Sequence, residues 1–166
     1  MTYKTLVGQD GSDVYKRCLA IRIAVFVDEQ KFTMEDELDE KDAASDHLLV
    51  VDVKEDGTEE DVGTIRWWPK PDQAAGKMGR VAVVQKYRGS GLGRVLIEAL
   101  HDHLVYRRGK AGIAAKGQKS VLSIAHSQAY AQGFYERNGY VREGDLFLED
   151  GADHCRMVRE ITLCTE

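Results

Sequence analysis

A glycine-rich segment holds the residues whose types and spacing point most directly to chemistry: Arg88-Gly89-Ser90-Gly91-Leu92-Gly93, followed by Arg94. Glycine residues allow a tight turn and let an anion approach the backbone amides. A helix that starts inside the segment adds unpaired N–H groups and the partial positive charge of its N-terminus. Two arginines add positive charge at the rim. Together these features predict a binding site for a phosphate or pyrophosphate group.

Two other phosphate-binding loops fit this segment less well. A P-loop would end in Gly-Lys-Ser or Gly-Lys-Thr, which is absent. A dinucleotide fingerprint would have glycine where this chain has Arg94, and an acidic residue about 20 positions later, in a region that holds Gly109 and Gly112. A purely structural glycine turn is the remaining alternative.

The elements around this segment must position it. An apolar strand over residues 78–84 precedes it, and apolar residues at helical spacing over 92–103 follow it. A second strand is predicted over 120–124 and a helix over 127–138, with Gly139 suited to a left-handed C-cap. We expect the two strands to be parallel neighbours joined by a right-handed crossover.

The rest of the chain supplies further strands and one helix. A strand over 2–7 precedes a helix that Ser12 would cap, with an apolar stripe at Val14, Cys18, Ile21 and Val25. Strands over 47–53 and 62–68 flank an Asp-Gly turn and predict a hairpin, followed by a loop around the prolines at 69 and 71. Two last strands, 141–149 and 154–163, flank a second Asp-Gly turn. The predicted fold class is α/β (α+β), with one mixed sheet covered by helices, in a single domain over residues 1–166.

Composition limits the classes of partner. The net charge of −5 argues against nucleic acid, and no apolar run approaches the roughly 20 residues of a membrane span. The start of the chain carries no targeting pattern, so we expect a cytoplasmic protein with no membrane partner. The three scattered cysteines, Cys18, Cys155 and Cys164, indicate reduced thiols and neither a disulfide framework nor a metal site.

Several motifs together resemble the GNAT superfamily of N-acetyltransferases, whose coenzyme A loop reads Arg/Gln-x-x-Gly-x-Gly/Ala. Arg88, Gly91 and Gly93 match that loop. The residues from Gly79 to Val83 and from Tyr87 to Leu96 look like its central motif, and those from Gln128 to Tyr140 like the next one. Residues 25–30 with Asp39, Asp42 and His47, and residues 147–151 with His154 and Met157, resemble a subgroup of small, mostly uncharacterised GNAT proteins. The match covers nearly the whole chain, and Tyr140 departs from the usual phenylalanine.

This resemblance implies an acyl-CoA N-acyltransferase fold and acetyl-coenzyme A as co-substrate, with no metal. The sheet would be mostly antiparallel, with a splayed parallel pair of strands into which the pantetheine arm fits and pairs with the first strand's backbone. The implied cofactor-binding residues are Val81, Ala82, Val83, Arg88, Gly89, Ser90, Gly91, Leu92, Gly93, Arg94, Gln128 and Phe134. A backbone N–H near Val83 would stabilise the oxyanion.

The implied reaction is direct attack of a primary amine on the thioester. Only about one lysine-like amine in 10³ is neutral at pH 7, so a base or desolvation must help. The resemblance places Tyr135 beside the thioester sulfur as general acid. Glu29 is the favoured base, because it closes the first predicted helix on the acceptor side; Glu37, Asp39, His47 and His154 are the other candidates. Trp67 and Trp68 must face opposite sides of one strand, one in the core and one free to line the acceptor pocket.

The acceptor is expected to be a small-molecule or peptide amine. Residues 28–46 contain nine acidic residues and two lysines, which would attract cationic amines if they formed a rim of the acceptor cleft. A solvated acidic loop is the alternative. A coenzyme A-binding regulatory module without turnover, and an acyltransferase for a different acyl-CoA, are the alternative functions. Either a monomer or a homodimer is compatible with the sequence.

Overall fold

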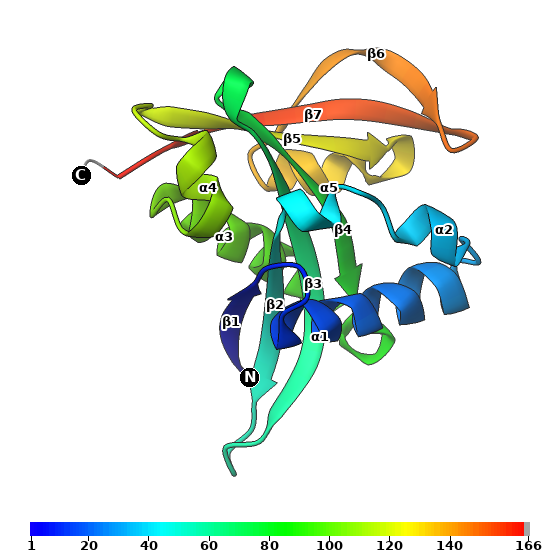
Figure 1. Cartoon of the computed structure of the whole chain (residues 1–166). Coiled ribbons are helices and arrows are strands. Elements are labelled where there is room, and N and C mark those ends of the chain that lie inside the picture. The colour runs from blue at the N-terminus through cyan, green and yellow to red at the C-terminus, as the bar shows by residue number, and fades with distance from the viewer. Residues whose placement is uncertain (165–166) are drawn as a thin grey trace.

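The computed structural model describes residues 1–164 of the chain (Figure 1). Its strands are β1 (Thr2–Gly8), β2 (Asp46–Val53), β3 (Glu59–Lys70), β4 (Ala75–Val83), β5 (Ser120–Gln128), β6 (Val141–Glu149) and β7 (Ala152–Thr162). Its α-helices are α1 (Asp13–Arg22), α2 (Met34–Glu37), α3 (Leu92–Val105), α4 (Gly109–Ala114) and α5 (Gln132–Arg137). A π-helical segment, η1 (Ile23–Glu29), continues α1. Every helix within residues 1–164 is too short or too polar to span a bilayer.

The seven strands of the described chain form one sheet in the order β1-β2-β3-β4-β5-β7-β6. Only β4 and β5 are parallel, and every other neighbouring pair is antiparallel. The mixed, mostly antiparallel sheet with one parallel pair is therefore confirmed. The helix that follows the glycine-rich segment, α3, belongs to the connection between these two parallel strands.

Local sequence signals set several of these elements. The side chain of Ser12 accepts a hydrogen bond from the Tyr15 amide at 3.1 Å, which is the N-cap that its position predicts. Gly57 has φ +83° in the β2–β3 hairpin turn, where the Asp-Gly pair predicted it. Gly139 has φ +83° directly after α5, as a left-handed C-cap requires.

The sheet has two differently covered faces. Helices α3, α4 and α5 cover one face, where Trp67, Leu96 and Met157 belong to the larger core. Helix α1 covers the other face over β1 to β4, where Cys18 and Ile21 pack against the sheet. We call these the α3 face and the α1 face. On the α1 face of β4, β5 and β7 a small apolar patch remains, made of Ala75, Leu122, Ile124 and Val158.

The parallel strands pair over only four residues and then diverge. Their register runs from Ala75 opposite Leu122 to Met78 opposite Ala125. Beyond this point β4 continues beside β3 and β5 continues beside β7, so that the two strands separate (Figure 1). A bulge in β4 accompanies the divergence, because the register with β3 shifts there and Arg80 has φ +51°. The splayed pair of strands expected from the motifs is present.

Several predicted boundaries of helices and strands were wrong. The strand predicted over 120–124 continues to Gln128, and α5 begins at Gln132, five residues after the predicted helix start. The antiparallel partner β7 extends β5, since Gln128 pairs with His154. The predicted loop around Pro69 is also partly strand, because β3 runs to Lys70 beside the N-terminal end of β4. The basic segment 107–119 contains the short helix α4.

Candidate functional site

The glycine-rich segment forms the N-terminus of α3 in a conformation that suits an anion. Gly89 and Gly91 have φ +77° and +83°, in the left-handed region that favours glycine. No turn or loop hydrogen bond within residues 1–164 uses the amides of residues 89–93. A Cβ added at Gly89 or Gly91 would meet nothing within 4 Å, so open space lies in front of both. Unpaired amides at a 14-residue helix therefore border a vacant space.

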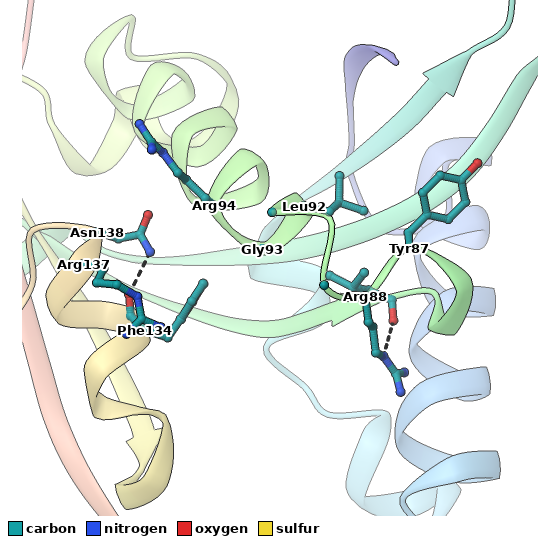
Figure 2. A pocket seen from close by; sticks show the side chains of 11 residues that line it. Tyr87, Arg88, Leu92, Gly93, Arg94, Phe134, Arg137 and Asn138 are labelled. Atoms are coloured by element: carbon teal, nitrogen blue, oxygen red, sulfur yellow. Dashed lines mark hydrogen bonds between the residues drawn. The ribbon is translucent and has the colours of Figure 1, made fainter.

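A cavity of about 420 Å³ lies between this segment and α5 (Figure 2). Three arginines line it: Arg88 beside the loop, Arg94 on α3 and Arg137 on α5. Phe134 and Asn138 form part of the opposite wall, and the Asn138 side chain donates a hydrogen bond to the Phe134 carbonyl at 2.8 Å. The positive charge and the free amides fit the diphosphate of a nucleotide-like cofactor.

Glycine at position 93 allows α3 and α5 to come close. A Cβ added at Gly93 would lie 3.1 and 3.2 Å from two ring atoms of Phe134. A second cavity, of about 490 Å³, shares Arg94, Arg137 and Asn138 with the first one. The two spaces therefore adjoin along the gap between α3 and α5.

Arg88 lines the cavity and extends its guanidinium toward Glu29 at the end of η1. Its Nε donates to the Val83 carbonyl at 3.1 Å, and its Nη2 lies 2.8 Å from the Glu29 carboxylate. Glu29, the base favoured from sequence, therefore lies beside the glycine-rich segment in an ion pair with Arg88. The side chain of Arg88 is 42% exposed and that of Glu29 34%, so solvent weakens this pair.

The edge of β4 that faces β5 is open beyond the last parallel pair. On the other side of β4, the Val84 amide donates to the carbonyl of Val62 on β3. Because backbone groups of successive strand residues point in opposite directions, the N–H and C=O of Val83 and Val81 face the gap. The side chain of Ala82 is buried under α1, whereas Val81 and Val83 pack against the core of the α3 face. An extended ligand could therefore pair with this edge.

Tyr135 lies on the α3 face of the sheet beside the divergence. Its ring packs against those of Phe134 and Tyr140, with centroids 5.2 and 5.9 Å apart. Burial raises the pKa of its hydroxyl to about 12, with the neighbouring Cys155 thiol as a smaller cause. Within residues 1–164 no hydrogen bond uses this hydroxyl, so it is a protonated donor without a protein acceptor.

Tyr140, the departure from the motif, has a structural explanation. Its hydroxyl is buried among Ser123 Oγ at 2.8 Å, His101 Nε2 at 2.9 Å and Met78 Sδ at 3.2 Å. Burial raises its pKa to about 12, so the hydroxyl stays neutral. These polar partners satisfy an atom that phenylalanine lacks.

Four acids of the 28–46 segment are held by other side chains and do not form a solvated rim; Glu37, Asp42 and Asp46 are buried and Asp39 is partly exposed. Glu37 and Asp42 accept hydrogen bonds from the buried Arg22, and Asp42 also from Arg66 at 2.8 Å. Asp39 pairs with Arg66 at 2.7 Å and with Arg80 at 3.2 Å. Asp46, fully buried as the first residue of β2, binds His103 and two α4 amides. Asp28, Glu35, Asp36 and Glu40 remain exposed, beside the partly exposed Glu29.

The other candidate bases, Glu37, Asp39, His47 and His154, each have partners within the protein. Glu37 and Asp39 are ion-paired. His47 donates from Nε2 to the Asp42 carbonyl at 3.0 Å and packs edge-on against Tyr15. Burial lowers the pKa of His47. His154 is buried near the start of β7, opposite Gln128 at the end of β5, with Nδ1 2.9 Å from the Ala152 carbonyl and its ring stacked on Phe147.

One cluster was missed by the sequence reasoning: Lys77 on β4, His126 on β5 and Glu149 on β6. His126 Nδ1 lies 2.8 Å from Lys77 Nζ and 3.0 Å from Glu149 Oε1. The signal that would have found His126 is the strand alternation of β5, which continues past residue 124. Within residues 1–164, no group of three or more His, Cys, Asp or Glu side chains is arranged to hold a metal ion.

Comparison with known proteins gives consistent results over most of the chain. A family model described as "Acetyltransferase (GNAT) domain" matches residues 44–142. The uncharacterised N-acetyltransferase YjcF of Bacillus subtilis is 34% identical over 146 residues, covering 87% of this chain and 91% of its own. A candidate N-acetyltransferase from Lactobacillus plantarum has a similar structure, with a TM-score of 0.76 and 26% identity over 97% of this chain and 99% of its own. The CoA-dependent acyl-homoserine lactone synthase BjaI shares the fold, with a TM-score of 0.71 and 18% identity over 96% and 84% of the two chains.

Proposed function

Because the chain belongs to the GNAT family of acetyltransferases, and so to the acyl-CoA-dependent N-acyltransferases, we propose that it transfers an acetyl group from acetyl-coenzyme A to a primary amine. The observation that carries this proposal is that a candidate anion site and an open strand edge lie next to each other. An arginine-lined cavity at the α3 N-terminus adjoins the open edge of β4, so one elongated ligand would meet an anion site first and a strand edge next. This order matches a diphosphate followed by an amide-containing arm.

We propose these roles for the chain's own residues in binding. The amides of residues 89–93 and the arginines at 88 and 94 hold the pyrophosphate. The backbone groups of Val81 and Val83 pair with the pantetheine amides, and Ala82 holds this segment against β3. Phe134 and Gln128 border the arm from α5 and from the end of β5. The thioester then lies where β4 and β5 diverge.

The proposed chemistry requires an acid for the leaving thiolate and a base for the amine. Tyr135 donates its proton to the sulfur; its raised pKa of about 12 keeps it protonated but makes it a weak acid, so its contribution is moderate. A backbone N–H near Val83 stabilises the oxyanion. Glu29 stays a prediction as the base, and its ion pair with Arg88 supports a second role, positioning that arginine.

A different acyl donor is the second candidate for the reaction. It is favoured by the fold that this chain shares with BjaI, a CoA-dependent acyl-homoserine lactone synthase. A coenzyme A-binding module without turnover is the non-enzymatic alternative. Release of free thiol from acetyl-, propionyl- and isopentyl-CoA, measured with the same amines, separates these three functions.

For the acceptor we propose a small-molecule or peptide amine, with a preference for cationic amines. Only the exposed acids of segment 28–46 can form the rim that attracts them, because Glu37, Asp39, Asp42 and Asp46 are held in ion pairs. Replacing Glu35 and Glu40 with glutamine should raise KM for a polyamine, and added salt should do the same, because exposed charges are screened over about 8 Å at physiological ionic strength. A KM indifferent to both would overturn the preference. Glu37 is unsuitable for this test, because it is buried in an ion pair.

The first experiment is a ligand-binding and turnover test of the unmodified protein. Acetyl-CoA should raise the melting temperature, since a ligand that binds only the native state stabilises it by about 2.7 kcal/mol at 100 times its Kd. Thiol release should then require an added amine and yield the acetylated amine. No thermal shift with any acyl-CoA would reject the cofactor, and a shift without thiol release would favour the regulatory module.

A further inference from the structure

The cluster of Lys77, His126 and Glu149 lies at the point where β4 and β5 diverge. Ala125 is the last β5 residue that pairs with β4, so His126 is the first beyond the pair. On β4 the corresponding position is Gly79, where an added Cβ would meet nothing within 4 Å. A half-buried imidazole therefore stands beside open space at the end of the gap in which we place the thioester.

The cluster lies on the face of the sheet opposite Tyr135. Ala125 and Val121 belong to the core of the α3 face, and Ile124 belongs to the patch on the α1 face. Strand alternation thus directs His126 to the α1 face. Tyr135 packs with the α3-face core beside Cys155, which pairs with Ser127, the residue after His126. An acid and a base candidate therefore flank the same point of the gap from opposite faces.

The hydrogen bonds at Nδ1 of His126 determine whether Nε2, the other ring nitrogen, can accept a proton. If Nδ1–H donates to Glu149, Nε2 carries the lone pair and can accept a proton. If Nδ1 instead accepts a hydrogen bond from Lys77, Nε2 carries the ring hydrogen and cannot accept a proton. No hydrogen bond within residues 1–164 uses Nε2, and it is not among the buried polar atoms that lack a partner, so it opens to accessible space.

We propose that His126, oriented by Glu149, is the general base that deprotonates the acceptor amine, and that Lys77 competes for the orienting hydrogen bond. This inference rests on the proposed function and names its base. Nε2 takes one proton from the ammonium group. The neutral nitrogen attacks the thioester carbonyl, a C–N bond forms and the C–S bond breaks. The nitrogen's second proton ends on the thiol sulfur through Tyr135, and His126 releases its own proton to solvent.

The charged groups around His126 allow this role near neutral pH. They are Lys77 on β4, Glu149 on β6, and Arg156 and His154 on β7, of which Arg156 pairs directly opposite His126. Burial lowers the pKa of His126, the Glu149 carboxylate raises it, and Lys77 lowers it again. The net direction is downward, so the imidazole is mostly neutral at pH 7. Burial also lowers the pKa of Lys77.

The test combines pH–rate profiles with three single variants, using acetyl-CoA and an amine that the wild type acetylates. His126→Gln should lower kcat/KM by roughly 10²- to 10⁴-fold and remove the acid limb, while the thermal shift by acetyl-CoA persists. Glu149→Gln should move the acid limb to lower pH, and Lys77→Met to higher pH. If Glu149 and Lys77 had only structural roles, the two variants would not move the acid limb of the pH–rate profile in opposite directions.

Glu29→Gln is the matched comparison for the competing base. It should keep the acid limb and weaken cofactor binding through Arg88. Loss of the limb in this variant, or its survival in His126→Gln, would overturn the inference.

NMR titration of the His126 imidazole, assigned by its absence from His126→Gln, gives a readout without an acceptor. Opposite pKa shifts in Lys77→Met and Glu149→Gln support the inference, and shifts in the same direction overturn it. Failure of every amine with the wild type would instead count against the proposed function.

Discussion

At the scale of single residues, Gly91 offers the sharpest test of the cofactor site. Gly91→Val would place a side chain in the open space before the α3 amides, at a left-handed φ of +83°. We expect loss of the thermal shift by acetyl-CoA. Gly57→Val is a matched control, because Gly57 has the same φ and the same open surroundings in a hairpin turn. Each variant should lose about 1–3 kcal/mol of stability to backbone strain, but Gly57→Val should still bind. Equal binding by both would reject the site.

Tyr135 and Tyr140 form a second matched pair. Tyr140 is buried and Tyr135 is partly buried, and burial raises the pKa of each to about 12, but only the hydroxyl of Tyr140 has protein partners. Tyr135→Phe should lower kcat by roughly 10- to 10³-fold with little change in cofactor affinity. Tyr140→Phe should instead lower the free energy of unfolding by about 0.5–3 kcal/mol, because Ser123 and His101 lose a partner. Wild-type turnover in Tyr135→Phe would show that this residue only packs.

At the scale of elements, a buried ion network fastens the segment after α1 to the sheet. Arg22 on α1, Asp42 before β2 and Arg66 on β3 meet with side chains that are 1%, 6% and 7% exposed. Removing one partner of such a network leaves a charge buried without compensation. Asp42→Ala should therefore lower the free energy of unfolding by about 3–5 kcal/mol.

Denaturant unfolding of Asp42→Ala measures this loss, with Glu40→Ala as the control. Glu40 lies two residues away, is exposed, and has no ion pair within residues 1–164. It should change stability by no more than about 0.5 kcal/mol. Equal effects of the two variants would mean that the network does not stabilise the fold.

At the scale of the whole molecule, stability should fall in two steps on acidification. Burial and the charge of Arg159 lower the pKa of His101 to about 4, so its neutral form is favoured by folding. That contribution is present above the unfolded value of about 6.5 and is lost as the pH falls from there toward 4. The melting temperature should decline over this range, and His101→Gln should flatten the decline.

The second step comes from three acids whose pKa is lowered in the folded state: Asp39, Asp42 and Asp46. Burial opposes their ionisation, but hydrogen bonds from Arg66, Arg22 and His103 outweigh it. Their stabilisation is present above the unfolded value of about 3.9 and is lost below it. The contribution of Glu37 to the pH dependence of stability has the opposite sign, because burial raises its pKa. Calorimetry between pH 7 and pH 3 should show a steeper fall below about pH 4, and a flat melting temperature there would contradict this account.

Features that depend on neighbouring residues could be predicted from the sequence. The proposed anion site is one of them, because its glycines and the helix start lie within six consecutive residues, 88–93. Hairpin turns, the Ser12 cap and the opposite faces of Trp67 and Trp68 are equally local. Trp67 is fully buried, and Trp68 is half-buried, with the ammonium of Lys41 4.8 Å from its ring centroid.

Features that depend on residues far apart in the chain could be seen only in the folded molecule. The end of β5 is set by pairing with β7, which local propensity does not contain, and the misplaced helix start hid His126 for that reason. The acids of segment 28–46 are indistinguishable in sequence. Arginines on α1, β3 and β4 hold Glu37, Asp39 and Asp42, and groups on α3 and α4 hold Asp46, which determines the acids that leave the solvent. Lys77, His126 and Glu149 lie 49 and 23 residues apart and meet only because β4, β5 and β6 belong to one sheet. Long-range strand order, which brings such residues together, is a property of the whole fold.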